Sequence, residues 1–294
     1  MTPYASETVL FGAVVVHHRS YNTVKSTVDA LAGGVTAPSA IVVVDNSEEP
    51  ERAGELERAF GTRAAVLRTS NKGYGAAVNA GIEWLRSELP DMRYLVVATH
   101  EARADPVAVR ELVAALECDS RAGVAGPTLR VHDGAGQVWS TGGFLTRVLR
   151  LPRHFDHRAE GIDKEVGTVE RMWVDGAFVL YRVDALNAAS MDESYFLYME
   201  EVDYHLRLRR AGWTTLHVPA AQVWQSSSGI PPYSLARNMQ LFQHAHGTRR
   251  GRAFATPWSI AHRALSNVVH GRRPVGLVAM LRGWRDGLSG FPHE

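Results

Sequence analysis

Three carboxylate residues crowd one short stretch of this sequence: Glu200, Glu201 and Asp203. They begin a segment, 200–211, whose apolar spacing predicts a helix that Gly212 ends. Neighbouring carboxylates raise one another's pKa, whereas the positive end of a helix dipole lowers it. Such a carboxylate stays ionised at neutral pH and can accept a proton from a hydroxyl, which is general-base chemistry. Alternatively, the acidic residues only stabilise the helix start.

Polar residues also follow four apolar runs in the first half of the chain. They are His17, His18 and Arg19; Asp45, Asn46 and Ser47; Thr69, Ser70, Asn71 and Lys72; and Thr99, His100 and Glu101. In an open parallel sheet, ligands bind at the carboxyl ends of the strands. Each group by itself is ordinary turn chemistry, but four in series favour one ligand-binding edge.

Alternating elements must position these residues. Apolar runs predict strands at 9–16, 41–44, 65–67 and 94–98. Helical spacing predicts helices at 23–31, 51–60, 75–89 and 106–116. Four strand–helix units in series indicate a parallel sheet with helices on both faces, and uninterrupted apolar strands are typical of such a sheet.

The second half of the chain has a less regular pattern. Strands are predicted at 172–180, 214–218 and 222–224. Further helices are predicted at 234–246, 257–270 and 275–288. Residues 127–170 are predicted to form loops and short strands.

Two common nucleotide-binding motifs are not matched. Gly73-Tyr-Gly75 begins a predicted helix, like half of a dinucleotide fingerprint, but the third glycine is missing. That fingerprint also belongs to the first strand–helix turn, and residues 17–22 contain no glycine. The sequence also lacks a Walker-type phosphate loop. These facts argue against a nicotinamide enzyme and against a P-loop NTPase.

Charge is balanced over the chain but unevenly distributed along it. Lys and Arg number 32 against 31 Asp and Glu, a net charge of +1, yet residues 247–294 contain eight arginines and only two acidic residues. The mildly acidic remainder makes nucleic acid a poor partner. The basic, partly apolar tail is either a solvated helical pair or a contact for an anionic membrane surface.

Composition sets further bounds. The 294 residues are 45% hydrophobic and 21% charged, which is typical of a folded globular protein. The single cysteine, Cys118, allows no intramolecular disulfide. No apolar run reaches the roughly 18 residues of a membrane span, and residues 1–7 lack a secretory-signal pattern. We therefore expect a cytoplasmic protein, with any membrane contact at the inner face.

Several stretches, taken in order, resemble the inverting family 2 glycosyltransferases with the GT-A fold, especially the rhamnosyltransferase-like branch. They are Ala13-Val-Val-Val-His-His-Arg19, Val42-Val-Val-Asp-Asn-Ser47, the segment from Asn71 to Ile82, Trp173-Val-Asp-Gly-Ala-Phe178, the segment from Met191 to Trp213, and Arg237-Asn238. The resemblance implies an α/β fold with a Rossmann-like, mostly parallel sheet, helices on both faces and a C-terminal helical extension.

The resemblance also implies a domain division and a nucleotide site. We expect a GT-A domain at 1–246, with a nucleotide-binding half at 1–126 and an acceptor-binding half at 127–246, before a basic helical extension at 247–294. Asp45 matches the aspartate that hydrogen-bonds the nucleotide base. The remaining matched positions of the nucleotide-sugar site are His17 and His18 at the base and ribose, Asn71 and Gly73 in the pocket loop, and Thr99, His100 and Glu101 after the fourth strand.

Catalytic roles are carried over in the same way. Glu201 matches the acidic position that resembles the general base, with Glu200 and Asp203 as its neighbours. It would deprotonate the acceptor hydroxyl for in-line attack on the anomeric carbon. Gly176 matches the small residue that lets acceptor and sugar approach the backbone.

The metal motif departs from the family pattern. Thr99-His100-Glu101 stands where the family has an aspartate-rich motif, so Glu101 is the only candidate carboxylate ligand there. Gln225 stands where a late histidine is common in the family. Because Mg²⁺ and Mn²⁺ favour oxygen ligands and carboxylate charge, we expect weak or absent metal dependence.

Two functions from different classes are left open. The first is transfer of a sugar, with inversion, from a dTDP- or UDP-linked donor to a hydroxyl of a glycan, lipid-linked or small-molecule acceptor. The second is a non-catalytic relative that binds a nucleotide or a partner protein through the same fold. The acidic helix start favours the first, and the altered metal motif favours the second.

Overall fold

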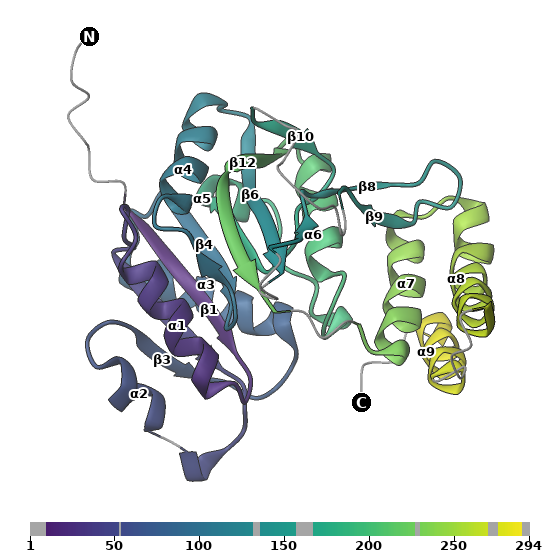
Figure 1. Ribbon diagram of the computed structural model, residues 1–294, viewed down its shortest axis with the longest axis horizontal. Helices are drawn as coiled ribbons and strands as arrows, with labels where there is room; N and C mark the ends of the chain where they lie inside the picture. Colours follow the sequence, from purple (N-terminus) through teal and green to yellow (C-terminus); the bar gives the residue numbers. More distant parts are fainter. Residues whose placement is uncertain are drawn as a thin grey trace.

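A central mixed sheet organises the protein (Figure 1). The computed structural model describes residues 10–52, 54–131, 136–156, 167–226, 230–269 and 276–289. The strands are β1 (Phe11–His17), β2 (Ala40–Asp45), β3 (Ala65–Arg68), β4 (Tyr94–Thr99), β5 (Arg103–Ala104), β6 (Ala122–Val131), β7 (Val138–Ser140), β8 (Gly143–Leu145), β9 (Pro152–His154), β10 (Val169–Arg171), β11 (Phe178–Arg182) and β12 (Thr214–Gln225). The main sheet has the order β10-β12-β6-β11-β4-β1-β2-β3.

The first four strands pair in parallel, as the sequence predicts. Strand β1 lies between β2 and β4, and β3 pairs with β2 at the edge. Strand β11 then enters antiparallel between β4 and β6, which makes the sheet mixed. Every residue of β1 is buried, because helices cover both faces of the sheet.

The helices α1 (Tyr21–Ala32), α2 (Glu55–Phe60), α3 (Tyr74–Glu88), α4 (Ala108–Cys118), α5 (Val183–Leu186) and α6 (Glu200–Arg210) bury apolar residues against the two faces of the sheet. The later helices α7 (Pro232–His246), α8 (Arg249–Val269) and α9 (Leu277–Ser289) pack on one another and on α6. Alternate β1 side chains enter two cores: Val15 packs with residues of α1, α2 and α4, whereas Val14 packs with residues of α3, α5 and α6.

Several sequence-based boundaries were wrong. The strand predicted at 172–180 begins only at Phe178, as β11. The helix predicted at 51–60 begins only at Glu55, because Gly54 has a left-handed φ of 86°. The strands predicted at 214–218 and 222–224 form one strand, β12, with a register shift between Val218 and Gln222. Helix α8 begins at Arg249 rather than at Pro257, since its first turns pack on α7, with Ala255 buried there.

Helices α7, α8 and α9 gather on the side of α6 that is remote from β3 (Figure 1). The backbones of α7 and α9 approach closely, because a Cβ atom at Gly283 would lie only 2.3 Å from the Tyr233 carbonyl oxygen. No helix among the described residues is both long and apolar enough to cross a bilayer. Residues 1–9, which carry the expectation about a leader, lie outside the described part, as do residues 270–275.

Candidate functional site

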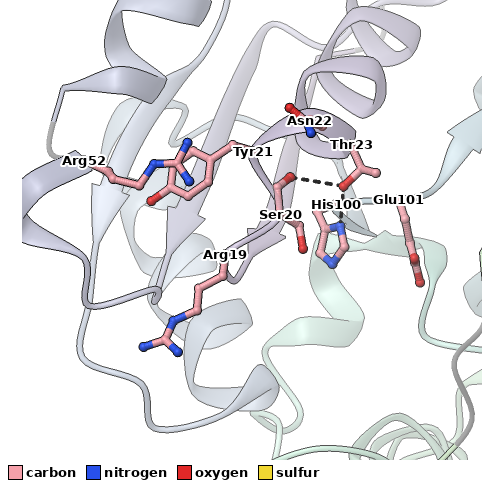
Figure 2. A pocket seen from close by; sticks show the side chains of 8 residues that line it. All are labelled: Arg19, Ser20, Tyr21, Asn22, Thr23, Arg52, His100 and Glu101. Atoms are coloured by element: carbon pink, nitrogen blue, oxygen red, sulfur yellow. Dashed lines mark hydrogen bonds between the residues drawn. The ribbon is translucent and has the colours of Figure 1, made fainter.

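The polar residues that follow β1, β2 and β4 meet at one edge of the sheet. In the sheet register His17 pairs with Asp45, and Val16 pairs with Thr99. A cavity of about 400 Å³ opens there (Figure 2). Its lining residues are Arg19, Ser20, Tyr21, Asn22, Thr23, Arg52, His100 and Glu101. The strand-end argument therefore located the edge, but it did not single out the lining contributed by α1 and by Arg52.

Asp45 and His17 form a buried pair at this edge. The His17 Nε2 accepts the backbone N–H of Ser20 at 3.0 Å, so its Nδ1–H donates to Asp45 Oδ1 at 3.1 Å. The backbone N–H of Ser47 donates to the same oxygen at 3.0 Å. Burial opposes ionisation of Asp45, but these hydrogen bonds prevail and lower its pKa to about 2. Asp45 is therefore anionic and held in one orientation.

The two histidines after β1 differ in their surroundings. His17 is fully buried, and both of its ring nitrogens are used within the protein, so it orients Asp45 rather than lining the cavity. His18 is exposed, and its Nδ1 lies 3.1 Å from the Asn46 carbonyl oxygen. Of the two, only His18 has a side chain that a ligand can reach from solvent.

The segment that ends β4 does not provide a ligand set for a divalent metal. His100 Nδ1 lies 2.8 Å from the Thr23 hydroxyl, and burial lowers the pKa of His100 to about 4, so the ring is neutral (Figure 2). Glu101 is the one carboxylate in the cavity lining, and burial raises its pKa. Among the described residues, no group of three or more His, Cys, Asp or Glu is arranged to hold a metal ion. These residues do not fit the Mg²⁺ or Mn²⁺ site that the family resemblance implies.

Asn71 and Gly73 connect this edge to the loop before α6. The Asn71 Oδ1 accepts from Asn46 Nδ2 and from the Gly73 N–H, each at 3.3 Å. Gly73 has a φ of 99°, and a Cβ atom there would lie 2.2 Å from the Phe196 carbonyl oxygen. That carbonyl accepts the Tyr74 N–H at 2.6 Å. Only glycine allows this close approach at position 73.

Glu200 and Glu201 form a buried acidic pair at the start of α6. The Glu200 side chain is only 3% exposed, and its Oε2 has no hydrogen-bond partner among the described residues. Burial raises the Glu200 pKa to about 7, with a further contribution from Asp175. Burial, Glu200 and Asp175 also raise the pKa of Glu201, which is half-buried. Glu200 can therefore hold or release a proton near neutral pH, and Glu201 binds a proton more tightly than an ordinary carboxylate does, which favours a general-base role.

Gly176 and Tyr198 place this acidic pair beside the cavity edge. A Cβ atom at Gly176 would lie 3.1 Å from the Glu201 Cβ, and the Gly176 carbonyl accepts the Tyr74 hydroxyl at 2.8 Å. The Tyr198 pKa is raised by burial and by the charges of Glu200, Glu101 and Glu201. Tyr198 therefore lies within electrostatic range of both the β4 end and the α6 start.

Asp203 belongs to a different cluster. Its Oδ2 accepts from Arg207 Nε at 2.7 Å, and its Oδ1 lies 2.6 Å from His246 Nε2 on α7. Burial would raise the Asp203 pKa, but His246 and Arg207 lower it. Glu201 and Asp203 lie about 200° apart around the helix. The structure thus ties Asp203 to α7 and leaves the glutamate pair at the site.

Asn238 on α7 holds the loop before α6 and was not among the residues expected at the site. Its Nδ2 lies 3.0, 2.7 and 2.9 Å from the carbonyl oxygens of Tyr195, Leu197 and Tyr198. Left-handed φ values of 62°, 73° and 76° occur at Phe196, Tyr198 and Met199. Such conformations are costly and persist only where the surroundings hold them. The Arg237-Asn238 motif in the sequence was a signal for this residue.

The sequence comparisons agree with one another. A family model described as glycosyl transferase family 2 matches residues 13–189. Two curated relatives, both described as N-acetylglucosaminyl-diphospho-decaprenol L-rhamnosyltransferase and from two strains of Mycobacterium tuberculosis, are 28% identical over 207 residues. Each alignment covers 63% of this chain and 66% of the relative, so the chain spans just under two thirds of the relatives' length.

Solved structures of low sequence identity share the fold. A crystal structure of GalNAc-T7 with UDP, GalNAc and Mn²⁺ has a TM-score of 0.64 at 13% identity and covers 98% of this chain and 56% of that one. The mannosyltransferase PcManGT from Pyrobaculum calidifontis, in complex with GDP-Man and Mn²⁺, has a TM-score of 0.62 at 10% identity, covering 95% and 86%. S. aureus TarS with UDP-GlcNAc has a TM-score of 0.59 at 12% identity, covering 96% and 82%.

Proposed function

This chain belongs to glycosyl transferase family 2, and from that premise we propose that it transfers a sugar from a dTDP- or UDP-linked donor to an acceptor hydroxyl, with inversion at the anomeric carbon. The observation that carries this proposal is the acidic pair Glu200–Glu201, buried beside an edge that presents an oriented anionic Asp45. One group is suited to accept a proton, and the other is suited to bind a nucleotide base.

The nucleotide half of the proposal uses the carboxyl edge of the sheet. Asp45 accepts hydrogen bonds from the base, held in place by His17. Arg19, which is 59% exposed and lines the cavity, is suited to balance diphosphate charge. The exposed Lys72 is a second candidate for this role. These cations stabilise the negative charge of the diphosphate in place of a metal ion, because the residues after β4 do not fit a metal site.

The chemical step uses the start of α6. Glu201 removes the proton of the acceptor hydroxyl, and the acceptor oxygen forms a bond to the anomeric carbon. The bond from that carbon to the diphosphate oxygen breaks, and its electron pair leaves with the nucleoside diphosphate. Glu200 and Asp175 keep the Glu201 carboxylate basic, because both oppose its ionisation.

The relatives' description supports one acceptor class. It names a diphospho-decaprenol, which favours a lipid-linked glycan over a free glycan or a small molecule as acceptor. It also names L-rhamnosyl transfer, which favours an L-rhamnosyl donor. A lipid-linked acceptor agrees with the expected location in the cytoplasm at the inner face of the membrane. A non-catalytic protein that binds a nucleotide or a protein partner remains the second candidate, favoured by the poor fit of the metal motif.

A binding and turnover experiment distinguishes the two candidates. Thermal shift and calorimetry with UDP, dTDP and GDP, with and without Mn²⁺, identify the nucleotide. Asp45→Ala is expected to weaken its binding by about 1–3 kcal/mol, whereas Asp91→Ala, at an exposed site, is the matched control. Donor hydrolysis or transfer, followed by NMR of the product's anomeric configuration, tests catalysis. Binding without turnover over all donors and acceptors tried would favour the second candidate.

A further inference from the structure

Exposed apolar side chains are concentrated on the two C-terminal helices. Nine large hydrophobic residues are exposed among the described residues, and seven of them lie on α8 or α9. Of the two others, Val35 stands apart on the body of the protein, whereas Val148 lies beside the start of α8, where its carbonyl oxygen accepts the Thr248 hydroxyl at 3.2 Å. Contiguous exposed apolar surface is uncommon on soluble monomers and marks an interaction site.

On α8 these residues form one continuous stripe. Phe254, Trp258, Leu265 and Val269 are 61%, 56%, 64% and 71% exposed. At about 100° per residue they fall within an arc of about 60°. Other α8 residues bury the opposite side: Ala255 packs with α7, and Ile260 packs with α7 and α9. We define Phe254, Trp258, Leu265 and Val269 as the α8 stripe.

The surface of α8 and α9 is strongly basic. The described parts of α8 and α9 carry six arginines: Arg249, Arg250, Arg252, Arg263, Arg282 and Arg285. Their one acidic residue, Asp286, is already paired with Arg285 at 2.8 Å. All four α8 arginines are exposed; at about 100° per residue Arg250 borders the stripe, and the other three lie about 100° or more away from it around the helix. An occupant of this face must therefore combine an apolar interior with negative charge.

We propose that the α8 stripe and the exposed arginines of α8 bind an anionic lipid membrane, with α8 lying in the plane of the interface. An amphipathic helix with aromatic and aliphatic residues on one face and arginines on the rest of its exposed surface binds in this way. A second copy of the chain fits less well, because pairing two such faces brings like charges together. The surface continues into the catalytic body through α7, which packs on both helices and also holds the loop before Glu200 through Asn238. This inference goes beyond sugar transfer and needs no turnover.

Vesicle co-sedimentation tests the proposal. The full chain is mixed with vesicles of phosphatidylcholine alone or with phosphatidylglycerol added. We expect binding to the anionic vesicles, little binding to the neutral ones, and weaker binding at high salt. The triple variant F254S/W258S/L265S should bind about tenfold or more weakly, because each substitution removes apolar area that would be buried in the membrane. The control V35S, which makes the same kind of change on the body, should bind as the wild type does.

Charge and folding controls complete the experiment. R249Q/R250Q/R263Q should weaken binding to anionic vesicles by about fivefold for each arginine removed. All substituted residues are exposed, so circular dichroism and the melting temperature should stay unchanged. Absence of binding by the wild type, or equal binding by the triple variant, overturns the proposal. Sedimentation velocity that shows a dimer disrupted by F254S/W258S/L265S also overturns it, in favour of a second copy. Transfer to a water-soluble acceptor is measured separately, so loss of vesicle binding and loss of catalysis are distinguishable.

Discussion

Gly176 and Glu201 are in direct packing contact: a Cβ atom at position 176 would lie 3.1 Å from the Glu201 Cβ and 3.2 Å from its Cγ. The absent side chain at 176 thus makes room for the acidic side chain at the start of α6. The sequence resemblance had assigned the small residue to substrate approach. The structure adds a second reason for it, which is the position of the proposed base.

Gly176→Ala is therefore expected to move Glu201 by a few tenths of an ångström. Transfer should fall by about tenfold to a hundredfold, because small misplacements of a reacting group are costly. Nucleotide affinity, measured by calorimetry, should stay near that of the wild type. Gly167→Ala is the control, since a Cβ atom there meets nothing within 4 Å. Wild-type turnover by Gly176→Ala would count against this contact as a determinant of catalysis.

Glu201→Gln tests the base directly. It keeps the size of the side chain and removes the proton acceptor, so turnover should fall by about 10²–10⁴. Nucleotide affinity should not change. Asp203→Asn is compared in the same assay, and because Asp203 is tied to Arg207 and His246, we expect it to lower stability more than turnover. Full activity of Glu201→Gln together with an inactive Glu200→Gln would transfer the role to Glu200.

The rate of transfer should depend on pH through the acidic pair. Burial, Glu200 and Asp175 raise the pKa of Glu201, so the base is protonated at low pH and kcat should rise with pH as Glu201 loses its proton. Glu200→Gln removes the charge that repels the Glu201 carboxylate. The rise of kcat with pH should therefore shift to lower pH in this variant. A pH profile of kcat for both proteins checks the shift. Identical profiles would show that the two carboxylates are not coupled in catalysis.

Stability should show the opposite pH trend. The Glu200 pKa is raised from 4.5 to about 7, so the folded state holds this proton more tightly than the unfolded state does. The stabilisation is full below pH 4.5 and is lost as the pH rises through 7. Glu200→Gln should therefore gain on the order of 1–3 kcal/mol at pH 8 and little at pH 5, by urea unfolding. Glu83→Gln, at an exposed site on α3, is the control and should show no such difference.

Asn238 is expected to act as a positioning residue for the loop before α6. Asn238→Ala should lower kcat by about tenfold to a hundredfold while the KM for the donor is nearly unchanged. Gln243→Ala is the matched control, because Gln243 is equally buried on α7 but bonds to Leu149 and Arg150, away from that loop. Equal losses of kcat in the two variants, in proportion to lost stability, would reduce Asn238 to a structural role.

Metal removal should change activity little. Glu101 is the single carboxylate lining the cavity, and His100 is neutral and bonded to Thr23, so divalent ions lack ligands there. We expect transfer in EDTA to stay within about twofold of transfer in Mn²⁺, since charge-assisted contacts to the diphosphate take the metal's place. Collapse of activity in EDTA and full recovery with Mn²⁺ would refute this expectation.

Much of the fold was predictable because its signals are local. Uninterrupted apolar runs indicated β1, β2 and β4, helical spacing indicated α1, α3 and α6, and their alternation indicated a mostly parallel sheet. The polar residues at the ends of β1, β2 and β4 came together for the same reason, since parallel strands end at one edge of the sheet. Errors arose where one residue or one tertiary contact outweighs the pattern, as at Gly54 and at the first turns of α8.

The sequence by itself determined which residue types stand at the strand ends and at the start of α6, because these follow from spacing along the chain. Only the tertiary structure decided what each of them contacts. It joined Asp45 to His17 and Asp203 to His246, and it left the glutamate pair buried beside Gly176. Asp45 lies 28 residues from His17 along the chain, and Asp203 lies 43 residues from His246. Glu201 lies 25 residues from Gly176. Contacts over such separations depend on how the elements pack together, and no local periodicity encodes that packing.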